Sequence, residues 1–554
     1  MPPRNDSTAQ ASVSDGWPWL RISLTLTLIA AAYIYRLDRP LLWGDEADTG
    51  IIARNVLRVG YPVAYDDRNV TMFENGSQLN RDLVCKKIPW VQYYLGALSI
   101  ELFGDSTAGL RMMFALVGVA AFFPIYAVLR SRVKCSIFVT ALALIAPQTL
   151  LFQRNARYYS TLILLDALLI WHLYTPLKSP KLRYASAIVI AVLFFHTHPL
   201  AAACSFAALI VYCLIFQRAT ALVYCISGGV GFLSWFIWQA ALGPSLGESN
   251  FAISQVTTDF SGWLHGFFVG IAAFVVDVDV VDCLPLLLWA ALLVVLWRKN
   301  RSEFINFFKQ PLPTFVLLNL LLQGLVTAVL FGSESGDDAD SLLRYMPHVL
   351  LFVSISGFLL LDRVIASKRL FAMACIAVVG CNLFTISYWT KPFTRQVPIS
   401  WSVPVYADII LPHDNVWDDI IGELRRQADR SAAHDATLLI SPPWVHDVAL
   451  YYLGDRYLVP PIFDPPCQIC EAAIARQIGN DAYQHLATKS RWVVDILGAE
   501  SSIPSDYEVV AQYPVFQRRP DDGTRPELTR HTFNQPESKS NPLGTATIYR
   551  LKSQ

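Results

Sequence analysis

The chain has 554 residues, of which 54% are hydrophobic and only 16% are charged. Soluble domains carry about 25% charged residues, and single soluble cores stop growing near roughly 250–300 residues, so one ordinary soluble domain is excluded. Lys and Arg number 44, the same as Asp and Glu, so the overall charge does not indicate a nucleic-acid partner. With a mean hydropathy of +0.39, the composition predicts a polytopic membrane protein.

Eleven apolar stretches approach the length of about 20 residues that a helix needs to cross a bilayer. They lie at residues 20–35, 107–129, 135–153, 158–175, 184–198, 199–216, 220–242, 283–297, 312–332, 344–362 and 369–389. The expected fold class is therefore an α-helical membrane protein with about 11 spans. Two further apolar stretches, 88–104 and 263–276, are expected to lie along the membrane interface.

Basic residues concentrate in every second connection between these spans. They are Arg130, Arg132 and Lys134; Lys178, Lys181 and Arg183; Arg218; Arg298, Lys299 and Arg301; and Arg363, Lys368 and Arg369. Because loops rich in Lys and Arg stay in the cytoplasm, residues 1–19 are expected to form a cytoplasmic tail. The transmembrane domain then covers residues 20–389, and its first long loop, residues 36–106, lies outside together with residues 390–554.

Residues 390–554 are polar and interrupted by prolines, and they contain no spanning stretch. Short apolar runs such as TLLISPPW, RYLVPPIF, SRWVVDIL, YEVVAQYPVF and TATIYRLK are typical of strands. The segment 415–430, opened by Asp414, is typical of a helix. We therefore expect a separate soluble α/β domain on the outer side.

Three acids stand directly after the first span, in the sequence LLWGDEADTGIIARNV. These are Asp45, Glu46 and Asp48. One interpretation is a helix start, since acids in a first turn complement the helix dipole. The other is a catalytic carboxylate that takes a proton from an acceptor hydroxyl attacking a sugar, provided that cations hold the departing phosphate.

Several basic residues are expected on the same outer face, against the positive-inside trend. They are Arg81, Lys86, Lys87, Arg154, Arg157 and Arg344. Each alone is explained by a lipid-headgroup or loop contact. Together they favour an anionic partner such as a lipid phosphate, either of bulk lipid or of a lipid-linked substrate.

Other polar residues leave open the question of whether the protein binds a metal ion. His196 and His198 flank Thr197 at the expected outer mouth of two spans. Capping of helix ends explains them better than a ligand role. The acids at 277, 279 and 282 and the loop 334–340 could bind a hard cation, but solvated loops are the simpler interpretation.

The order of motifs resembles a known family. The motifs are GDEA after the first span, a Lys before Pro89, YYLGALSIELFGDSTAGLR, RNARYYSTLILLDAL, FHTHPLA and LLRYMPHVLLF. Together they resemble the lipid-phosphate-sugar-dependent glycosyltransferases of the GT-C superfamily, over roughly residues 20–390. The most similar branch groups protein O-mannosyltransferases, aminoarabinose transferases of lipid A and related bacterial enzymes.

The resemblance implies inverting transfer of a sugar from a polyprenyl phosphate to a cell-envelope glycan, lipid or protein, outside a bacterial plasma or inner membrane. Asp45 matches the family's general base, and Glu46 would orient the acceptor or hold a divalent metal ion, the one cofactor left open. Lys87 stands where the family binds the lipid phosphate, although the usual double proline reads Ile88-Pro89 in this chain. Arg344 is a second phosphate candidate.

Arg157 and Asp48 complete the candidate substrate-binding residues. Some relatives carry a further acid near the start of the fourth span, where this chain has Arg154 and Arg157. The nearest acid, Asp166, is expected to lie too deep in the membrane to replace it.

The rival interpretation is a transporter or flippase that moves a lipid-linked anion with the same outer cations. Transporter folds usually show paired halves with short connections. This chain shows no internal repeat and has a 71-residue first loop, so the pattern favours the transferase. A transferase-like scaffold without activity is a third possibility, and the presence of Asp45 disfavours it.

Overall fold

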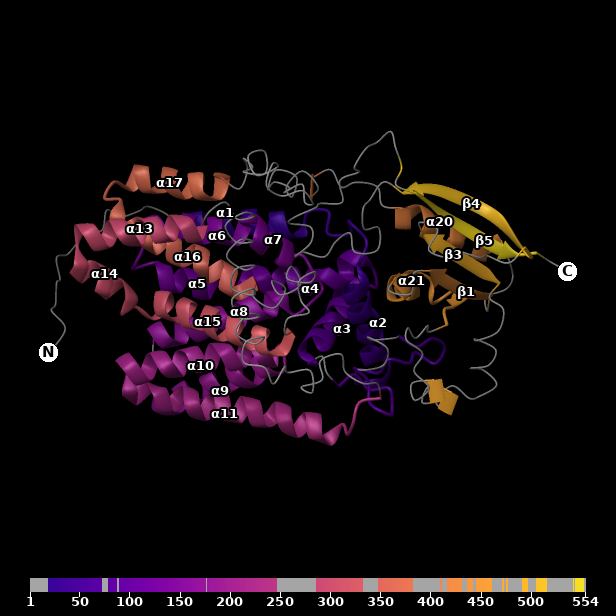
Figure 1. The fold of residues 1–554 in the computed structure, drawn as a ribbon, viewed down its shortest axis with the longest axis horizontal. Coiled ribbons are helices and arrows are strands. Elements are labelled where there is room, and N and C mark those ends of the chain that lie inside the picture. Colours follow the sequence, from indigo (N-terminus) through magenta and orange to yellow (C-terminus); the bar gives the residue numbers. More distant parts are fainter. Residues whose placement is uncertain are drawn as a thin grey trace.

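The computed structural model divides the chain into a helical bundle and a smaller α/β region, which lie at opposite ends of an elongated molecule (Figure 1). It describes residues 18–71, 78–86, 89–175, 177–246, 285–331, 347–381, 409–410, 416–430, 436–441, 445–460, 471–472, 475–476, 491–496, 505–515, 542 and 544–552. Of the predicted features, the interfacial stretch 263–276, the two possible cation loops, Lys87 and Arg344 lie outside the described residues.

Helices form at every predicted span. They are α1 (Pro18–Ile34), α4 (Thr107–Ala120), α5 (Phe122–Leu129), α6 (Ser136–Ile145), α7 (Pro147–Gln153), α8 (Tyr159–Tyr174), α9 (Pro180–Phe195), α10 (Pro199–Phe216), α11 (Arg218–Ala241), α13 (Pro285–Lys299), α15 (Pro311–Phe331), α16 (Pro347–Val364) and α17 (Lys368–Cys381). A further helix, α14 (Arg301–Phe308), lies between two predicted spans. The span predicted at 135–153 is divided into α6 and α7 at Pro147, because proline cannot continue the hydrogen-bond ladder of the preceding turn.

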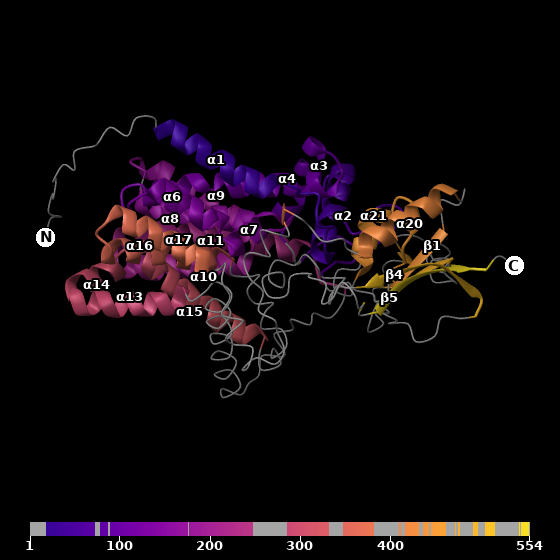
Figure 2. The same cartoon turned by 90° about the horizontal axis from the view of Figure 1, so that it is seen from above.

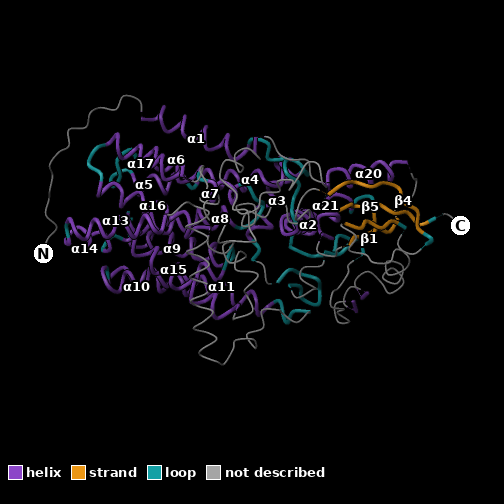
Figure 3. The backbone as a smooth tube through the Cα atoms, turned by 45° about the horizontal axis from the view of Figure 1, so that its top comes forward, coloured by secondary structure: helices purple, strands orange, loops and turns teal. Residues whose placement is uncertain are grey.

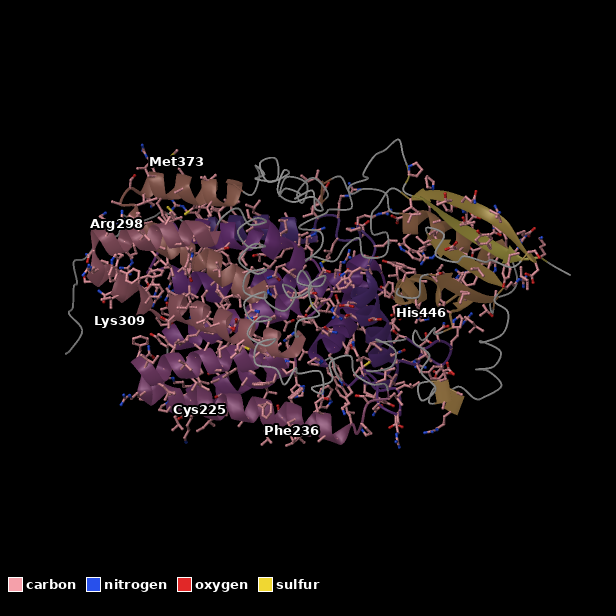
Figure 4. The ribbon with its side chains drawn as sticks, in the orientation of Figure 1. Cys225, Phe236, Arg298, Lys309, Met373 and His446 are labelled. Carbon is pink, nitrogen blue, oxygen red and sulfur yellow. The ribbon has the colours of Figure 1, made fainter. Side chains whose placement is uncertain are left out.

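Length and composition qualify four helical segments of the described chain to cross a membrane, or five if the bent pair α14–α15 counts as one. Three shorter apolar helices coincide with α1, α6 and α8. Large apolar side chains point away from the bundle, including Phe236 and Met373, which are 54% and 64% exposed (Figure 4). An apolar outer surface of this kind suits a lipid environment, and the chain is an integral membrane protein.

The core of the bundle is built around α8, which is buried on nearly all sides. It packs against α4, α5, α9 and α16, and in the view from above it lies within the outline of the bundle (Figure 2). Tyr159, Leu162 and Leu169 are fully buried there. This arrangement fits a helix that is apolar all round.

Two helices of the first long loop stand between the bundle and the α/β region. These are α2 (Gly44–Val59) and α3 (Val91–Phe103), which pack against each other. Helix α2 ends at Gly60, whose φ of +87° lets its N–H bond back to Val56 O. Helix α3 occupies the stretch for which an interfacial helix was expected.

The α/β region contains one five-stranded sheet with the order β2-β1-β3-β5-β4. Its strands are β1 (Ala436–Ser441), β2 (Tyr457–Leu458), β3 (Trp492–Ile496), β4 (Tyr507–Val515) and β5 (Gly544–Leu551), and its helices are α20 (Val416–Arg430) and α21 (His446–Leu453). Strand β1 runs parallel to β2 and β3, whereas β5 is antiparallel to β3 and β4. All five predicted strands and the predicted helix are present, and α21 is an additional helix.

The α/β region shares its hydrophobic core with the first long loop. One continuous cluster joins Ile52 and Ala97 of the loop to Trp417, Leu450 and the inner face of the sheet. Helices α2 and α21 lie side by side in both views (Figures 1 and 3). A Cβ atom at Gly50 would stand 2.4 Å from the ring of Tyr451, so the two helices approach closely there. The expected boundary at residue 390 therefore does not separate two independently packed cores.

Candidate active site

Asp45 lies in the first turn of α2, where the chain turns from α1 toward the α/β region. Its Oδ2 is 2.9 Å from Nη2 of Arg157, and Nη1 of the same arginine donates to the Asp45 carbonyl at 3.3 Å. The Asp45 side chain is 30% exposed and that of Arg157 only 8%. A buried guanidinium thus holds a partly open carboxylate at the helix start.

The pairing also fixes the charge of the arginine. Burial alone would lower the pKa of Arg157, but the Asp45 carboxylate and nearby tyrosines outweigh it, so the pKa is raised. Arg157 is therefore always a cation, and its charge favours the ionised form of Asp45. Asp45 has the exposure and the charge that a general base requires.

Glu46 points the other way and is completely buried. Its Oε2 accepts from Nη2 of Arg111 at 2.5 Å, while Oε1 accepts from Nε of Arg111 at 2.8 Å and from the backbone N–H of Ala156 at 2.7 Å. Arg111 also donates to the carbonyls of Leu37 and Pro40. The pair joins α4, the start of α2 and the turn before α8.

These contacts place Glu46 in a buried network. Both of its oxygens accept hydrogen bonds within the protein. In the described chain no group of three or more His, Cys, Asp or Glu side chains is arranged to hold a metal ion. The roles expected for Glu46, orienting the acceptor or holding a metal ion, stay predictions; its bonds tie the first turn of α2, which carries Asp45, to α4 and to the turn before α8.

Asp48 faces the α/β region, where it meets Asp447 of α21. The hydroxyl of Thr71 lies between the two carboxylates, 3.1 Å from Asp48 Oδ1 and 2.6 Å from Asp447 Oδ1. Burial and the charge of Asp447 raise the pKa of Asp48 well above its usual value. Burial opposes ionisation of Asp447 as well, but the hydrogen bond and charge of His446 outweigh it and lower the pKa of Asp447.

The two carboxylates of this cluster differ in their preference for a proton. The Thr71 hydroxyl has one proton to donate, and the raised pKa of Asp48 beside the lowered pKa of Asp447 favours Asp48 as the protonated member. Asp447 stays ionised, with Nδ1 of His446 at 3.1 Å; His446 is labelled in Figure 4. Asp48 was expected to bind substrate, but the structure places it inside the contact between α2 and α21.

Two of the four described cations expected to gather on this face, Arg154 and Lys86, bind backbone carbonyls. Arg154 donates to the carbonyls of Ala32, Tyr33 and Tyr35 and so caps the end of α1. Lys86 bonds to the carbonyl of Gly243. Of these cations, Arg157 is the one that reaches the acids of α2.

The histidines and Asp166 have partners of their own. His196 ends α9, and His198 caps α10 by accepting the Ala201 N–H at its Nδ1, as the capping interpretation predicts. Asp166 is fully buried in the middle of α8, with its Oδ2 3.7 Å from Nε2 of His348. That it lies too deep to act beside Asp45 stays a prediction.

Sequence reasoning missed Arg111, His446 and Asp447. Arg111 had a signal, because a lone arginine inside an apolar stretch at a helix start calls for a buried partner. The pair His446-Asp447 had none, since its partners on the first long loop are more than 370 residues away in sequence.

Comparisons with known proteins identify the fold. No protein-family model matches the chain, and no curated protein matches its sequence. Among solved structures, ArnT from Cupriavidus metallidurans bound to undecaprenyl phosphate is similar over 98% of this chain and 99% of its own, with a TM-score of 0.53 and 13% identity. ArnT in the apo state aligns with a TM-score of 0.49 at 14% identity over 96% and 98% of the two chains.

The oligosaccharyltransferase AglB from Archaeoglobus fulgidus, in complex with an inhibitory peptide and a dolichol-phosphate, aligns over 88% of this chain and 70% of its own, with a TM-score of 0.44 and 12% identity. The match to ArnT confirms the fold that the motif order predicted. The chain has the fold of ArnT: a helical membrane bundle followed by a small α/β region.

Proposed function

We propose that this protein is an inverting glycosyltransferase that moves a sugar from a polyprenyl-phosphate carrier to a cell-envelope acceptor. The observation that carries the proposal is the Asp45–Arg157 pair, a partly exposed carboxylate beside a buried guanidinium at the end of a membrane bundle of the GT-C fold. ArnT, which has the same fold, was solved with undecaprenyl phosphate bound.

In the proposed reaction, Asp45 accepts the proton of an acceptor hydroxyl while the hydroxyl oxygen attacks the anomeric carbon. The bond from that carbon to the phosphate oxygen breaks, and the polyprenyl phosphate leaves with the electron pair. Arg157 keeps Asp45 ionised and oriented, and Glu46 with Arg111 fixes the helix start. Lys87 and Arg344 remain our candidates for the lipid phosphate.

The proposed reaction takes place outside the cytoplasm. Arg298 and Lys309 lie at the end of the bundle far from the α/β region (Figure 4), as the positive-inside rule predicts if that end is cytoplasmic. Alkaline phosphatase fused at Gln554 should be active and green fluorescent protein should not. The reverse result would contradict the sidedness.

The decisive test of the function is Asp45→Asn, which keeps size and removes the ability to accept a proton. Sugar transfer from a labelled polyprenyl-phosphate donor in nanodiscs should fall by about 10² to 10⁴-fold, the usual effect of losing a general base. Asp38→Asn is the matched control, because Asp38 lies seven residues earlier with a 64% exposed side chain and should transfer normally. Normal transfer by folded Asp45→Asn would exclude Asp45 as the base.

The same assay separates the transferase from the rival flippase. A protein that only moves a lipid-linked anion gives no transferred product, and lipid translocation would survive Asp45→Asn. Mass spectrometry of envelope glycans and glycolipids with and without the gene would then identify the sugar and the acceptor.

A further inference from the structure

A pocket of about 450 Å³ lies between α2 and the α/β region, apart from the candidate active site. Its lining includes Arg54 and Arg58 of α2, Arg68 of the first long loop, and Arg425 of α20. Arg54 follows Asp45 by about two and a half helical turns, so its side chain leaves α2 on the side opposite to Asp45. The pocket therefore does not open onto the proposed base.

The acidic side chains of the pocket are already bonded within the protein. Asp105 accepts two charged hydrogen bonds from Arg54, at 2.8 and 3.0 Å. Asp455 pairs with Arg456 at 3.2 Å, and Asp66 accepts the backbone N–H groups of the turn that follows it. The lining holds four arginines against these three aspartates, so its net charge is positive.

The arginines of the pocket, by contrast, carry more N–H donors than their bonds within the protein use. Among the described residues, Arg425 makes one hydrogen bond, from Nη2 to the carbonyl of Tyr452 at 2.9 Å, and its side chain is exposed. Arg58 uses its two terminal nitrogens on Asp67 and the carbonyl of Tyr65. Guanidinium groups with N–H groups to spare are the protein's preferred ligands for carboxylate and phosphate oxygens.

The rest of the pocket fits a hydroxylated ligand. Its volume lies within the roughly 300–1,000 Å³ of small-molecule sites, which exceeds the needs of a bare phosphate. Asn55, Tyr451 and Tyr452 line the pocket together with the charged residues, and Ile51 and Leu450 are the aliphatic members of the lining. A long acyl chain or an aromatic ligand would meet too little apolar surface.

We propose that this pocket binds an anionic sugar, a pyranose that carries a carboxylate or a phosphate, with Arg425 as a principal ligand of the anion. The site does not depend on the transfer chemistry at Asp45. It would hold a charged residue of an envelope glycan against the junction of α2 and α21.

The test is calorimetric titration of the full-length protein in phosphatidylcholine nanodiscs with glucuronate, glucose 6-phosphate, inorganic phosphate and glucose. The two charged sugars should bind, and glucose should bind at least about tenfold more weakly, as expected for losing a charged hydrogen bond. If inorganic phosphate binds as tightly as glucose 6-phosphate, the pocket recognises the anion alone, and the claim that it binds a sugar is wrong. Equal binding of glucose, or no binding of any probe, would overturn all of it.

Arg425→Gln should weaken glucuronate binding by about tenfold or more. The matched control is Arg426→Gln, because Arg426 is the next residue of α20 but pairs with Glu423 and is 63% exposed. An equal loss in both variants would contradict the assignment. If Arg425→Gln does not fold, Arg58→Gln provides the same comparison. Asp45→Asn should bind glucuronate normally, which separates failure of this pocket from failure of the proposed transferase.

Discussion

The two hydrophobic cores of the molecule are built from the chain in different ways. The bundle core joins the apolar faces of the membrane helices, and apolar contacts dominate it. The second core joins the first long loop to segments beyond residue 416, and charged groups lie inside or beside it: Arg111 with Glu46, and Asp48 with Asp447. Hydropathy therefore accounts for the first core, whereas the second depends on a few specific polar pairs.

The largest effect should come from breaking the buried ion pair. Arg111→Ala leaves Glu46 charged and unpaired in a fully buried position, which costs about 3–5 kcal/mol of stability. The control is Arg363→Ala, because Arg363 pairs with Glu303 at 3.0 Å with both side chains 39% exposed, and such a pair contributes about 1 kcal/mol or less. Thermal unfolding of both variants in the same detergent measures the contrast. Equal shifts would mean that the second core does not depend on this pair.

A larger side chain at the contact between α2 and α21 should cause the next largest loss of stability. In Gly50→Ala the new methyl group collides with Tyr451, and overpacking of this kind costs about 1–3 kcal/mol. Gly229→Ala in α11 is the control, because a Cβ there meets nothing within 4 Å. Protease cleavage within α21 should accelerate in the first variant only, and unchanged cleavage would show that the two helices separate without cost.

The carboxylate pair makes the second core sensitive to pH in two opposite ways. The pKa of Asp48 is raised, so its contribution to stability is complete at low pH and is lost as the pH rises through that pKa. The pKa of Asp447 is lowered, so its contribution is present above the ordinary aspartate pKa and is lost as the pH falls through the lowered value.

Asp48→Asn should therefore remove the decline at high pH, and Asp447→Asn should remove the decline at low pH. Melting temperatures measured from acid to mildly alkaline pH test both. A curve for Asp48→Asn that still falls on the alkaline side as in the parent protein would show that this aspartate is not the protonated member.

The smallest effect is expected at the edge of the second core. Arg39 pairs with Asp418 of α20 at 2.5 Å, with side chains 41% and 26% exposed. A partly exposed pair contributes about 0.2–1 kcal/mol, so Arg39→Gln should lower stability only slightly. Its effect should shrink in high salt, whereas that of Arg111→Ala should not. A larger loss than for Gly50→Ala would mean that this edge pair matters more to the second core than the contact between α2 and α21.

The difference between the cores also explains what could be predicted from the sequence. All eleven apolar stretches coincide with helices, because each stretch carries its own signal. Asp45 could be found because it lies in a short motif directly after a span. The sequence also indicated its partner Arg157, but as a ligand of the phosphate, because the residues around an arginine in the sequence do not show which anion it contacts.

The second core was not predictable in this way. Glu46 and Arg111 are 65 positions apart, and Asp48 meets Asp447 across almost 400. Helix α21 is only eight residues long, and its sequence HDVALYYL has no helical period that stands out. A separate outer domain was the natural expectation from composition, and only the three-dimensional contact of Gly50 with Tyr451 shows that the two parts share one interior.

The close contact at Gly50 sets an order of events during synthesis. Helix α21 follows α2 by roughly 390 residues, which a ribosome working at about 5–20 residues per second takes roughly 20–80 s to translate. Throughout that interval the side of α2 that packs against α21 in the folded protein lacks this partner, although α3 already covers another side. A nascent chain of this protein must therefore keep that face from aggregating until its last third emerges, and chains that stop early are expected to be substrates for quality-control proteases.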